Sequence, residues 1–359
     1  MKVLHVAPLN VAGVPYLMMD MQRRFGAEAT LVTLHGSTHT FPEDVCLNLP
    51  LPRNPLAQWW RARKVSEGHI AKRNPPIPSS TPVLVPKNFI EGLYFRYDDH
   101  RRERVVEEAV ERFNLNTFDI IHYDGGVDFF RDCRLARQWK KSGKKIVCHY
   151  MGSDLRVRGI VPEMDALSDL NLTNESDHLL LHPSINYLYI PFDTSSVAAN
   201  PRRAGLLRIV HSPTNRSMKG TSFILPVVDA VKKVRDVEFV LVENTPHEEV
   251  LRLKQTCDIA IEQVGNLGGT GYGRNSLETL AMGIPTITEM TPDYIAWLPE
   301  NPFILATRET LYDTLLKVID DKDLRAAQGT KGRAWVQKYH SYESVHDRLL
   351  QLYHEHHIL

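Results

Sequence analysis

The chain alternates short apolar runs with helix-like segments, and this alternation constrains its fold more than any other feature. In the N-terminal half, the pattern predicts strands at 3–7, 30–34, 120–122 and 145–149 and helices at 14–25, 98–113 and 127–141. Strands that are separated by helices usually pair in parallel. The reason is that the chain has to cross back along the sheet between two parallel strands, and it usually does so as a helix. We therefore expect an open parallel sheet with helices packed on it.

The C-terminal half repeats this pattern. Strands are predicted at 206–210, 238–242, 258–261 and 284–288 and helices at 221–234, 246–256 and 275–282. We expect an α/β fold of two doubly wound, Rossmann-like parallel-sheet domains that face one another across a cleft, since open sheets bind ligands at the carboxyl ends of their strands. The predicted domains are 1–192, with a proline-rich insertion at 36–97, and 193–335; a C-terminal helix at 336–359 is expected to pack back toward the first domain.

The overall composition narrows the class of protein. At 359 residues the chain exceeds the usual size of one hydrophobic core, which favours two domains. Its 43 basic and 43 acidic residues give zero net charge, so we expect no nucleic-acid partner. The four cysteines form no C-x-x-C pair, and no stretch reaches the roughly 18 apolar residues of a membrane span, so the sequence predicts a cytoplasmic protein without disulfides.

A glycine-rich run at 268–278 leads into the helix predicted at 275–282. Glycine lets the backbone approach an anion closely, and the first N–H groups of a helix carry partial positive charge. A phosphate can bind at such a helix start without a dedicated cation. The run therefore predicts a phosphate site, and a diphosphate is the expected ligand.

A second loop, at 211–221, follows the strand predicted at 206–210 and contains Arg216 and Lys219. The arginine can hold phosphate oxygens with its planar fork, and the lysine adds a point charge. Charge-assisted hydrogen bonds are stronger than the contribution of a helix end, so these two side chains would dominate the binding of a diphosphate. A solvated basic turn is the alternative interpretation of this loop.

Glu278 has two interpretations. With Asn275 it forms a pattern like a capping box, in which the carboxylate would accept a hydrogen bond from an N–H at the start of the helix. A glutamate at the start of a helix beside a phosphate loop can instead accept the hydroxyls of a ribose, as the acidic residue of a dinucleotide site does. The sequence leaves both interpretations open.

Four segments resemble the family-four retaining glycosyltransferases of the GT-B fold type, and the resemblance extends over nearly the whole chain. The segments are 209–221, which contains the two cations, 271–285, which contains Glu278, 149–156, which contains Asp154, and 11–15, which contains Gly13. In such a family member, Arg216 and Lys219 would hold the diphosphate of the donor. Glu278 would hold the ribose of its nucleotide.

The resemblance implies transfer of a sugar from a UDP- or GDP-sugar to a sugar, lipid-linked or protein acceptor with retention of the anomeric configuration. It implies no metal or other cofactor, because the two cations and the helix start would stabilise the departing diphosphate. It also implies no covalent intermediate, since the leaving phosphate can help to deprotonate the acceptor. The predicted donor-binding residues are Gly13, Arg216, Lys219, Thr270, Gly271, Tyr272, Gly273, Arg274, Asn275 and Glu278. The predicted catalytic residues are His122, His149 and Asp154.

Two positions depart from the family pattern. Thr270 stands where the family has a glutamate that contacts the donor sugar, and Met151 stands where a histidine is frequent. An imidazole at the reaction centre would then come from His122 or His149, and a histidine that makes only backbone contacts is the alternative for each. Two further functions stay open, a nucleotide-sugar epimerase of the same fold and a non-catalytic module that binds nucleotide sugars.

The insertion contains a tryptophan pair, Trp59 and Trp60, among six basic residues and one glutamate from 52 to 73. This composition suits a membrane interface, a sugar platform or a polyanion, and it equally suits tryptophans that pack against their own domain. We expect the segment to shape the choice of acceptor. Peripheral membrane contact through 53–73 is the alternative.

Two other groups of ligand-type residues are given structural interpretations. His354, His356 and His357 lie near the C-terminus, where histidines are usually solvated, and they are not expected to bind a metal. Asp321 and Asp323 resemble the carboxylate pair of a metal site. They precede a predicted helix, so a capping role is expected instead.

Overall fold

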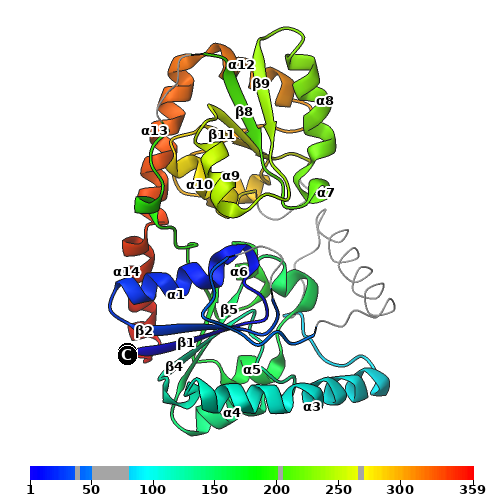
Figure 1. Cartoon of the computed structure of the whole chain (residues 1–359), viewed down its shortest axis with the longest axis vertical. Coiled ribbons are helices and arrows are strands. Elements are labelled where there is room, and N and C mark those ends of the chain that lie inside the picture. Colours follow the sequence, from blue (N-terminus) through cyan, green and yellow to red (C-terminus); the bar gives the residue numbers. More distant parts are fainter. Residues whose placement is uncertain (37–40, 51–80, 201–204, 266–270) are drawn as a thin grey trace. The chain divides into compact units, whose positions relative to one another are not determined.

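The computed structural model describes residues 1–36, 41–50, 81–200, 205–265 and 271–359 (Figure 1). The chain forms two compact units, an N-terminal unit of Met1–Pro191 with Val345–Leu359 and a C-terminal unit of Phe192–Ser344. Each unit contains one sheet, so the predicted pair of parallel-sheet α/β domains is confirmed. The boundary expected between 335 and 336 falls inside helix α13 (Lys322–Tyr339), and the chain returns to the N-terminal unit within α14 (Tyr342–Glu355).

The N-terminal unit is built on a seven-stranded sheet with the order β3-β2-β1-β4-β5-β6-β7. All of its strand pairs are parallel. The strands are β1 (Lys2–Ala7), β2 (Glu28–Thr33), β3 (Val45–Cys46), β4 (Ile120–Asp124), β5 (Lys145–Tyr150), β6 (Leu170–Thr173) and β7 (Ile185–Tyr187). The strand order reverses between β1 and β4, which makes this place the topological switch point of the sheet.

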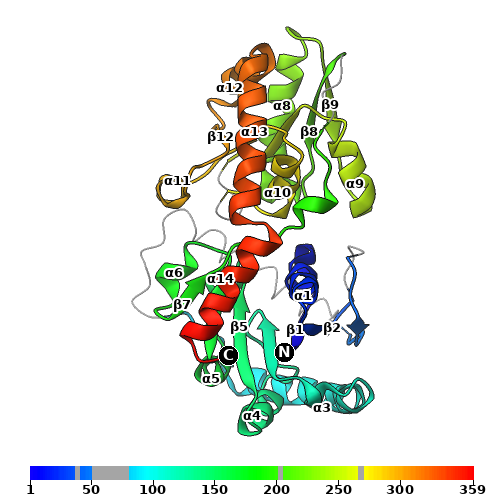
Figure 2. The ribbon, with the colours of Figure 1, turned by 90° about the vertical axis from the view of Figure 1, so that its left-hand side faces the viewer.

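Helices cover both faces of this sheet (Figure 2). Helix α1 (Val14–Arg24) lies with α14 on one face, and α3 (Phe89–Arg112), α4 (Arg134–Lys141) and α5 (Pro162–Leu167) lie on the other. The short helix α6 (His178–Leu181) precedes β7. On the α4 side, Leu4 and Ile121 of the strands pack with Trp139 in one apolar cluster. The opposite face of the same strands carries polar side chains, which are described below.

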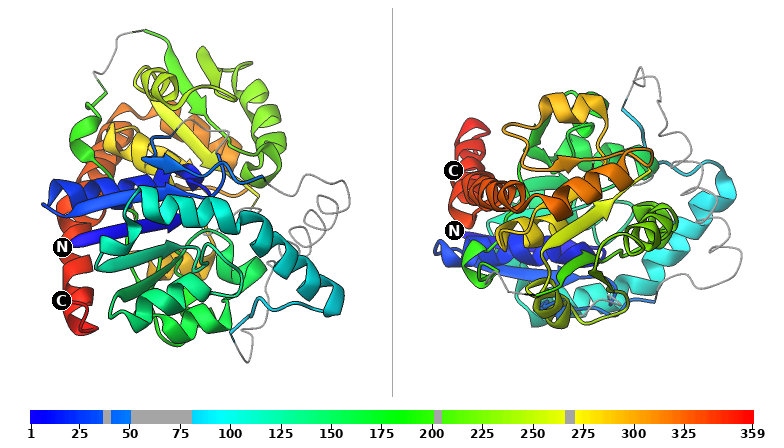
Figure 3. Two further views of the ribbon diagram at one scale, coloured as in Figure 1. Left: turned by 60° about the horizontal axis from the view of Figure 1, so that its bottom comes forward. Right: turned by 90° about the horizontal axis from the view of Figure 1, so that it is seen from above.

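Two helices of this unit begin at residues that the sequence pattern did not predict. Helix α3 begins at Phe89 rather than at residue 98, because the Asn88 side chain accepts a hydrogen bond from the N–H of Glu91 and caps it. Helix α3 is the long cyan coiled ribbon in Figure 3. Helix α4 begins at Arg134 rather than at 127, since the preceding residues form a loop whose Asp128 carboxylate accepts hydrogen bonds from the first N–H groups of the helix.

The C-terminal unit contains a five-stranded parallel sheet with the order β12-β11-β10-β8-β9. The strands are β8 (Leu207–His211), β9 (Val237–Leu241), β10 (Ile259–Gln263), β11 (Thr286–Thr288) and β12 (Ile304–Leu305). The order reverses between β8 and β10. Ligands of open parallel sheets bind at such a switch point, outside the carboxyl ends of the strands.

In the described part of the C-terminal unit, six helices surround this sheet, in addition to α13. They are α7 (Arg216–Lys219), α8 (Thr221–Val231), α9 (His247–Lys254), α10 (Arg274–Ala281), α11 (Pro292–Trp297) and α12 (Leu311–Asp320). Helices α8 and α12 share an apolar core with the strands, and α10 packs against α13. The Asp321 side chain accepts a hydrogen bond from the N–H of Leu324 at 2.8 Å, so its predicted capping role at the start of α13 is confirmed.

Several other predictions concern single residues or short segments. The four cysteines are free thiols. His354 and His357 are exposed as expected, whereas His356 is half-buried. None of the helices within the described ranges is long and apolar enough to cross a membrane. Thr270 and the tryptophan-containing segment 53–73 lie outside the described residues.

Candidate functional site

The loop after β8 brings Arg216 and Lys219 to the carboxyl edge of the C-terminal sheet. They are the first and last residues of α7, which Asn215 caps by accepting a hydrogen bond from the N–H of Ser217. Gly220 follows with a φ of 68°, and a Cβ at this position would lie 1.7 Å from the carbonyl oxygen of Val264. Only glycine fits there, so the sequence at 220 allows the loop to lie against the end of β10.

Arg216 forms a two-point ion pair with Glu243, in which Nε and Nη2 lie 2.7 and 2.5 Å from the two carboxylate oxygens. The hydrogen bond from Arg216 lowers the pKa of Glu243. The Arg216 side chain is 57% exposed, so water screens this pair and an incoming anion can reach the guanidinium. A phosphate offers the same two-point geometry and can take the place of the carboxylate.

Lys219 donates a hydrogen bond to Glu262 at the end of β10, and its ammonium also lies 3.1 Å from Oε1 of Gln263. The Glu262 carboxylate has no exposed surface, and it also accepts hydrogen bonds from Asn275 and from the hydroxyl of Ser276. Burial alone would raise the pKa of Glu262, but the charge of Lys219 and these donors lower it. Glu262 is therefore ionised at neutral pH and fixes the lysine beside the first turn of α10.

Glu278 is paired inside the unit. Lys254 donates to its Oε2, and Nε2 of His247 lies 2.6 Å from its Oε1. Arg274 adds a third contact at 3.3 Å. Burial alone would raise the pKa of Glu278, but Lys254, His247 and Arg274 lower it to about 2. The capping-box interpretation is wrong, because Gly273 occupies the N-cap position and the carboxylate contacts α9 instead.

The start of α10 is shaped by glycines, as the sequence indicated. Gly271 has a φ of 125°, and a Cβ there would lie 2.4 Å from Cγ of Met290, so the absence of a side chain permits this close approach. At Gly273, an added Cβ would meet nothing within 4 Å. The side chain of Asn275 accepts a hydrogen bond from Oγ of Ser212 at 2.6 Å. Within the described residues no side chain caps this helix, so an anion would be its natural cap.

Tyr272 packs in an aromatic cluster. Its ring stacks on Tyr294 with centroids 5.9 Å apart, and its hydroxyl lies 3.3 Å from Nε2 of His340. Phe303 and Trp335 lie against the same ring. These contacts give Tyr272 a structural role in the C-terminal unit, and its predicted contact with the donor stays a prediction.

Gly13 and Asp154 both lie in the N-terminal unit, after the ends of β1 and β5. Gly13 is buried at the start of α1 with a φ of 70°. Asp154 opens the helical turn η4 (Asp154–Arg158) and accepts a hydrogen bond from the N–H of Met151 at 2.9 Å. Its side chain is 30% exposed and lies 3.3 Å from Arg158. Asp154 can therefore be reached by solvent.

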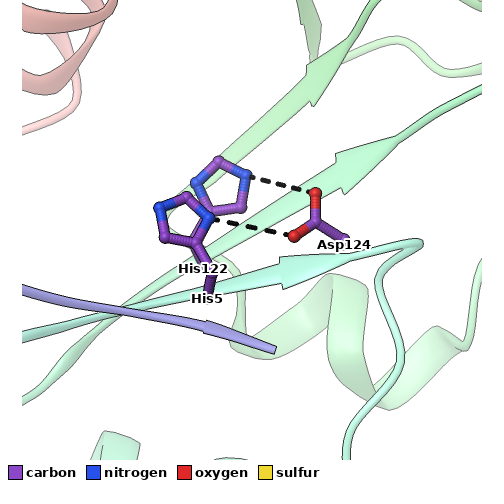
Figure 4. A group of neighbouring side chains, drawn as sticks. All are labelled: His5, His122 and Asp124. Carbon is purple, nitrogen blue, oxygen red and sulfur yellow. Dashed lines mark ion pairs between the residues drawn. The ribbon is translucent and has the colours of Figure 1, made fainter. Parts of the chain in front are cut away.

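His122 and His149 lie inside the N-terminal unit beside His5 and Asp124. Figure 4 shows His5, His122 and Asp124 of this group. The three imidazoles have no exposed surface. Burial lowers the pKa of His149 to about 3 and lowers that of His122 well below its usual value, so both rings are neutral. A ring without exposed surface contacts no acceptor in this conformation. The catalytic role of His122 and His149 stays a prediction.

A cavity of about 520 Å³ lies at the carboxyl edge of the N-terminal sheet. Pro8, which follows β1, and Val127, which follows β4, line it on the strand side. Phe95 and Arg96 of α3 line it on the helix side, together with Arg131. Its volume is that of a small-molecule site, and it combines an aromatic ring with cations.

Four partners of the candidate site residues were missed by the sequence reasoning. Glu262 could have been found from the sequence, because it is a charged residue directly after the apolar run 259–261 at the end of a predicted strand. His247 and Lys254 lie two helical turns apart and so share one face of α9, but nothing in the sequence showed that Glu278 lies opposite. Glu243 could have been found in the same way as Glu262, because it is a charged residue directly after the strand predicted at 238–242.

No protein-family model matches the chain, and no curated protein matches its sequence. Solved structures do match. HepE (Alr3699) of Anabaena in complex with UDP has a TM-score of 0.58 at 12% identity, over 98% of this chain and 99% of that chain. A trehalose-6-phosphate synthase has a TM-score of 0.60 at 9% identity, over 98% and 99% of the two chains. A UDP-N-acetylglucosamine 2-epimerase has a TM-score of 0.52 at 12% identity, over 100% and 97%. The chain thus has the GT-B fold of two Rossmann-like domains.

Proposed function

We propose that the chain is a glycosyltransferase that moves a sugar from a nucleoside-diphosphate sugar to an acceptor hydroxyl. The observation that carries this proposal is the convergence of Arg216, Lys219 and the start of α10 at the switch point between β8 and β10. Two cations and a helix start suit the phosphates of such a donor. The fold is shared with HepE, which was solved with UDP, and with a trehalose-6-phosphate synthase.

Stabilisation of the leaving diphosphate is the proposed source of catalysis. When the bond between the sugar and the diphosphate breaks, negative charge grows on the phosphate oxygens. Lys219 is already held in place by the buried Glu262, so it needs no reorganisation at that moment. Arg216 would exchange Glu243 for the phosphate when the donor binds.

Retention of the anomeric configuration is part of the proposal. The bond from the anomeric carbon to the diphosphate breaks, a bond to the acceptor oxygen forms on the same face, and the acceptor proton passes to a diphosphate oxygen. No protein nucleophile is needed for this step. The likeness in fold to a trehalose-6-phosphate synthase that was studied for glycosyl transfer with retention supports this assignment.

Glu278 is proposed to accept the hydroxyls of the donor ribose. In the present structure its carboxylate is occupied by Lys254 and His247. The Lys254 side chain is 1% exposed, whereas that of His247 is 27% exposed, so His247 is the partner that a ribose hydroxyl would displace. Lys254 would then keep the carboxylate ionised and in position.

The acceptor is proposed to bind in the 520 Å³ cavity of the N-terminal unit. Arg131 stacks on the Phe95 ring with its guanidinium carbon 4.3 Å from the ring centroid. Arg96 and Arg131 provide donors for sugar hydroxyl groups, and three lining carboxylates, those of Asp99, Asp128 and Asp132, provide acceptors. Sugar, lipid-linked and protein acceptors all present a hydroxyl, and the segment 53–73 is proposed to select among them. No metal or other cofactor is part of the proposed reaction.

Incubation with a set of UDP-, GDP- and TDP-sugars, with and without acceptors, tests the function. The proposal predicts release of the nucleoside diphosphate that depends on the acceptor, and a product whose anomeric proton coupling matches that of the donor. Epimerised donor without an acceptor would instead indicate an epimerase, the function of one neighbour of the same fold. Binding without turnover would indicate a non-catalytic module.

A further inference from the structure

Four polar side chains of the N-terminal unit converge on one face of three adjacent strands. His5 of β1 lies opposite His122 of β4, and Asp124 of β4 lies opposite His149 of β5. His122 and Asp124 are two residues apart, and side chains two apart on a strand point to the same face. All four therefore lie on the face of the sheet opposite Leu4 and Ile121, which is the face that α1 covers. Figure 4 shows three of them, His5, His122 and Asp124, on one side of the strands.

The inward-pointing atoms of this group lie at distances that a metal ion can bridge. Nε2 of His122 lies 3.2 Å from Nδ1 of His149 and 4.0 Å from a carboxylate oxygen of Asp124. The same carboxylate lies 3.8 Å from Nδ1 of His5 and 3.9 Å from Nδ1 of His149. Donors around a tetrahedral zinc ion lie about 3.3 Å apart, given zinc–nitrogen bonds of about 2.0–2.1 Å. Ligand atoms of His5, His122 and Asp124 all lie within 4.8 Å of one another, and Nδ1 of His149 lies beside them next to His122.

Three of these atoms lack a hydrogen-bond partner within the described residues. Among the residues that the structure describes, neither carboxylate oxygen of Asp124 has a hydrogen-bond partner, and Nδ1 of His5 has none. Each buried polar atom without a partner costs about 1–3 kcal/mol, so several in one place are unusual in a stable sheet. One cation at the centre of the group would satisfy Nδ1 of His5 and both carboxylate oxygens of Asp124 together.

The second ring nitrogen of His5, Nε2, makes a hydrogen bond of the kind that is usual for a histidine that ligates a metal. Its Nε2 lies 2.6 Å from Oε1 of Gln22, and the Gln22 amide donates to the hydroxyl of Tyr353 at 3.2 Å. With the amide in this orientation, Nε2 of His5 carries the proton and Nδ1 turns its lone pair toward Asp124. Histidines that ligate metals donate their second N–H to an oxygen in this way, which fixes the tautomer.

We propose that His5, His122, His149 and Asp124 bind one structural zinc ion. Three imidazoles and one carboxylate form a donor set that suits zinc. The four groups fill a tetrahedral shell with protein atoms and have at most 1% exposed surface, so no position is open to substrate. The ion therefore joins β1, β4 and β5 at the switch point of the sheet and takes no part in sugar transfer, and as its ligands His122 and His149 would not have the catalytic role predicted from the sequence. This inference stands independently of the proposed function.

Refolding of the full chain tests the site, because a buried ion has to enter as the protein folds. The chain is unfolded in a chelator, refolded with Zn²⁺ or with the chelator, passed through a desalting column and analysed for metal. The proposal predicts one zinc per chain after refolding with Zn²⁺ and a higher melting temperature than for the chelated sample. A folded chain that retains no zinc would overturn the proposal, and would indicate a shared proton between Asp124 and the histidines.

Variants locate the ion. His122→Phe and Asp124→Asn are expected to abolish zinc retention, and Gln22→Leu to weaken zinc binding by about 10–100-fold. His211→Phe is the matched control, since His211 is also a buried strand histidine but bonds to the carbonyl of Ile261 and the hydroxyl of Thr221. A second control, His354→Ala with His357→Ala, removes exposed histidines. Both controls should keep the zinc.

Zinc that persists in the His122→Phe and Asp124→Asn variants would place the ion elsewhere and overturn the proposal. Should these variants fail to fold, the visible absorption spectrum of the wild-type chain refolded with Co²⁺ tests the coordination of the ion instead. Tetrahedral coordination by nitrogen and oxygen predicts strong visible absorption bands. The weak spectrum of an octahedral aqueous ion would contradict the site.

Discussion

Lys219 and Glu262 form an ion pair at the carboxyl edge of the C-terminal sheet, in which the carboxylate has no exposed surface while the lysine side chain remains 21% exposed. Glu262 thus anchors the lysine from inside the unit. The exposed part of the lysine side chain can still meet a ligand. A buried acidic residue can therefore contribute to a site that binds an anion. Glu262 positions Lys219, and burial shields the Glu262 carboxylate from the phosphates.

Substitution of Lys219 is expected to destabilise the C-terminal unit. In Lys219→Met the Glu262 carboxylate stays buried without its cation, which predicts a loss of about 3–5 kcal/mol in the free energy of unfolding. Urea denaturation measures this loss. The matched control is Lys338→Met, because Lys338 pairs with Glu300 on the surface, where both side chains are 55% exposed.

The double variant Lys219→Met with Glu262→Gln should recover part of the stability, because it removes the unpaired buried charge. If Lys219→Met unfolds at the same urea concentration as the Lys338→Met control, the buried pair does not hold this edge of the sheet together.

Arg216→Ala is expected to weaken the binding of a nucleoside diphosphate by about 10–150-fold, the worth of one charge-assisted hydrogen-bonding group. Calorimetric titration measures the dissociation constant. Arg235→Ala is a close control, since Arg235 also makes a two-point pair with a carboxylate, that of Asp320, and is 42% exposed. Equal affinities in the two variants would exclude Arg216 from the site.

The pKa of Glu278 predicts how stability depends on pH. Its value is about 2 in the folded chain against an ordinary value of 4.5, so the folded state favours the ionised form. The stability that ionised Glu278 provides is therefore complete above about pH 4.5 and is lost as the pH falls toward about 2. The stability advantage of the wild type over Glu278→Gln should shrink across this window. A constant difference from pH 6 to pH 2 would argue against the ion pair with Lys254.

Deletion of residues 55–75 is expected to abolish sugar transfer and to leave nucleotide affinity unchanged, because the segment belongs to the N-terminal domain and the residues predicted to hold the diphosphate and the ribose lie in the C-terminal unit. Transfer assays and nucleotide titration on the same deletion variant check both halves of this expectation. Loss of nucleotide affinity along with transfer would count against a role in acceptor choice.

The sequence predicted the strands that are apolar and the helices that alternate with them. Strands β6 and β7 were missed because they are short and polar in sequence: Asn171 lies in β6 and is buried only because its amide donates to Asp165. The start of α3 was missed because Phe89 and Ile90 are more than three-quarters exposed, so this part of the helix has no apolar side facing the core.

The candidate site was predictable where one loop contains its chemistry. Arg216 and Lys219 stand three residues apart after a strand, so composition and spacing were enough to identify them. The partners of Glu262 and Glu278 come from α7, α9 and α10, and their contacts depend on how these helices pack.

The grouping of His5 and Asp124 with His122 and His149 could not be predicted for a similar reason, because it depends on how the strands pair. His122 and His149 were singled out in the sequence, but the register of β1, β4 and β5 adds His5 and Asp124 to them. Pairing of residues that lie far apart in the chain is set by the folded sheet, so periodicity within one strand does not predict it.

The central claim is that the C-terminal unit holds a donor diphosphate, and a crystal structure with a bound nucleoside diphosphate tests it most directly. The nucleotide to use is the one that raises the melting temperature most. We predict that its phosphates bind Arg216 and Lys219 and cap the start of α10. A nucleotide bound at another place, with Arg216 still on Glu243 and the start of α10 without a phosphate, would contradict the account.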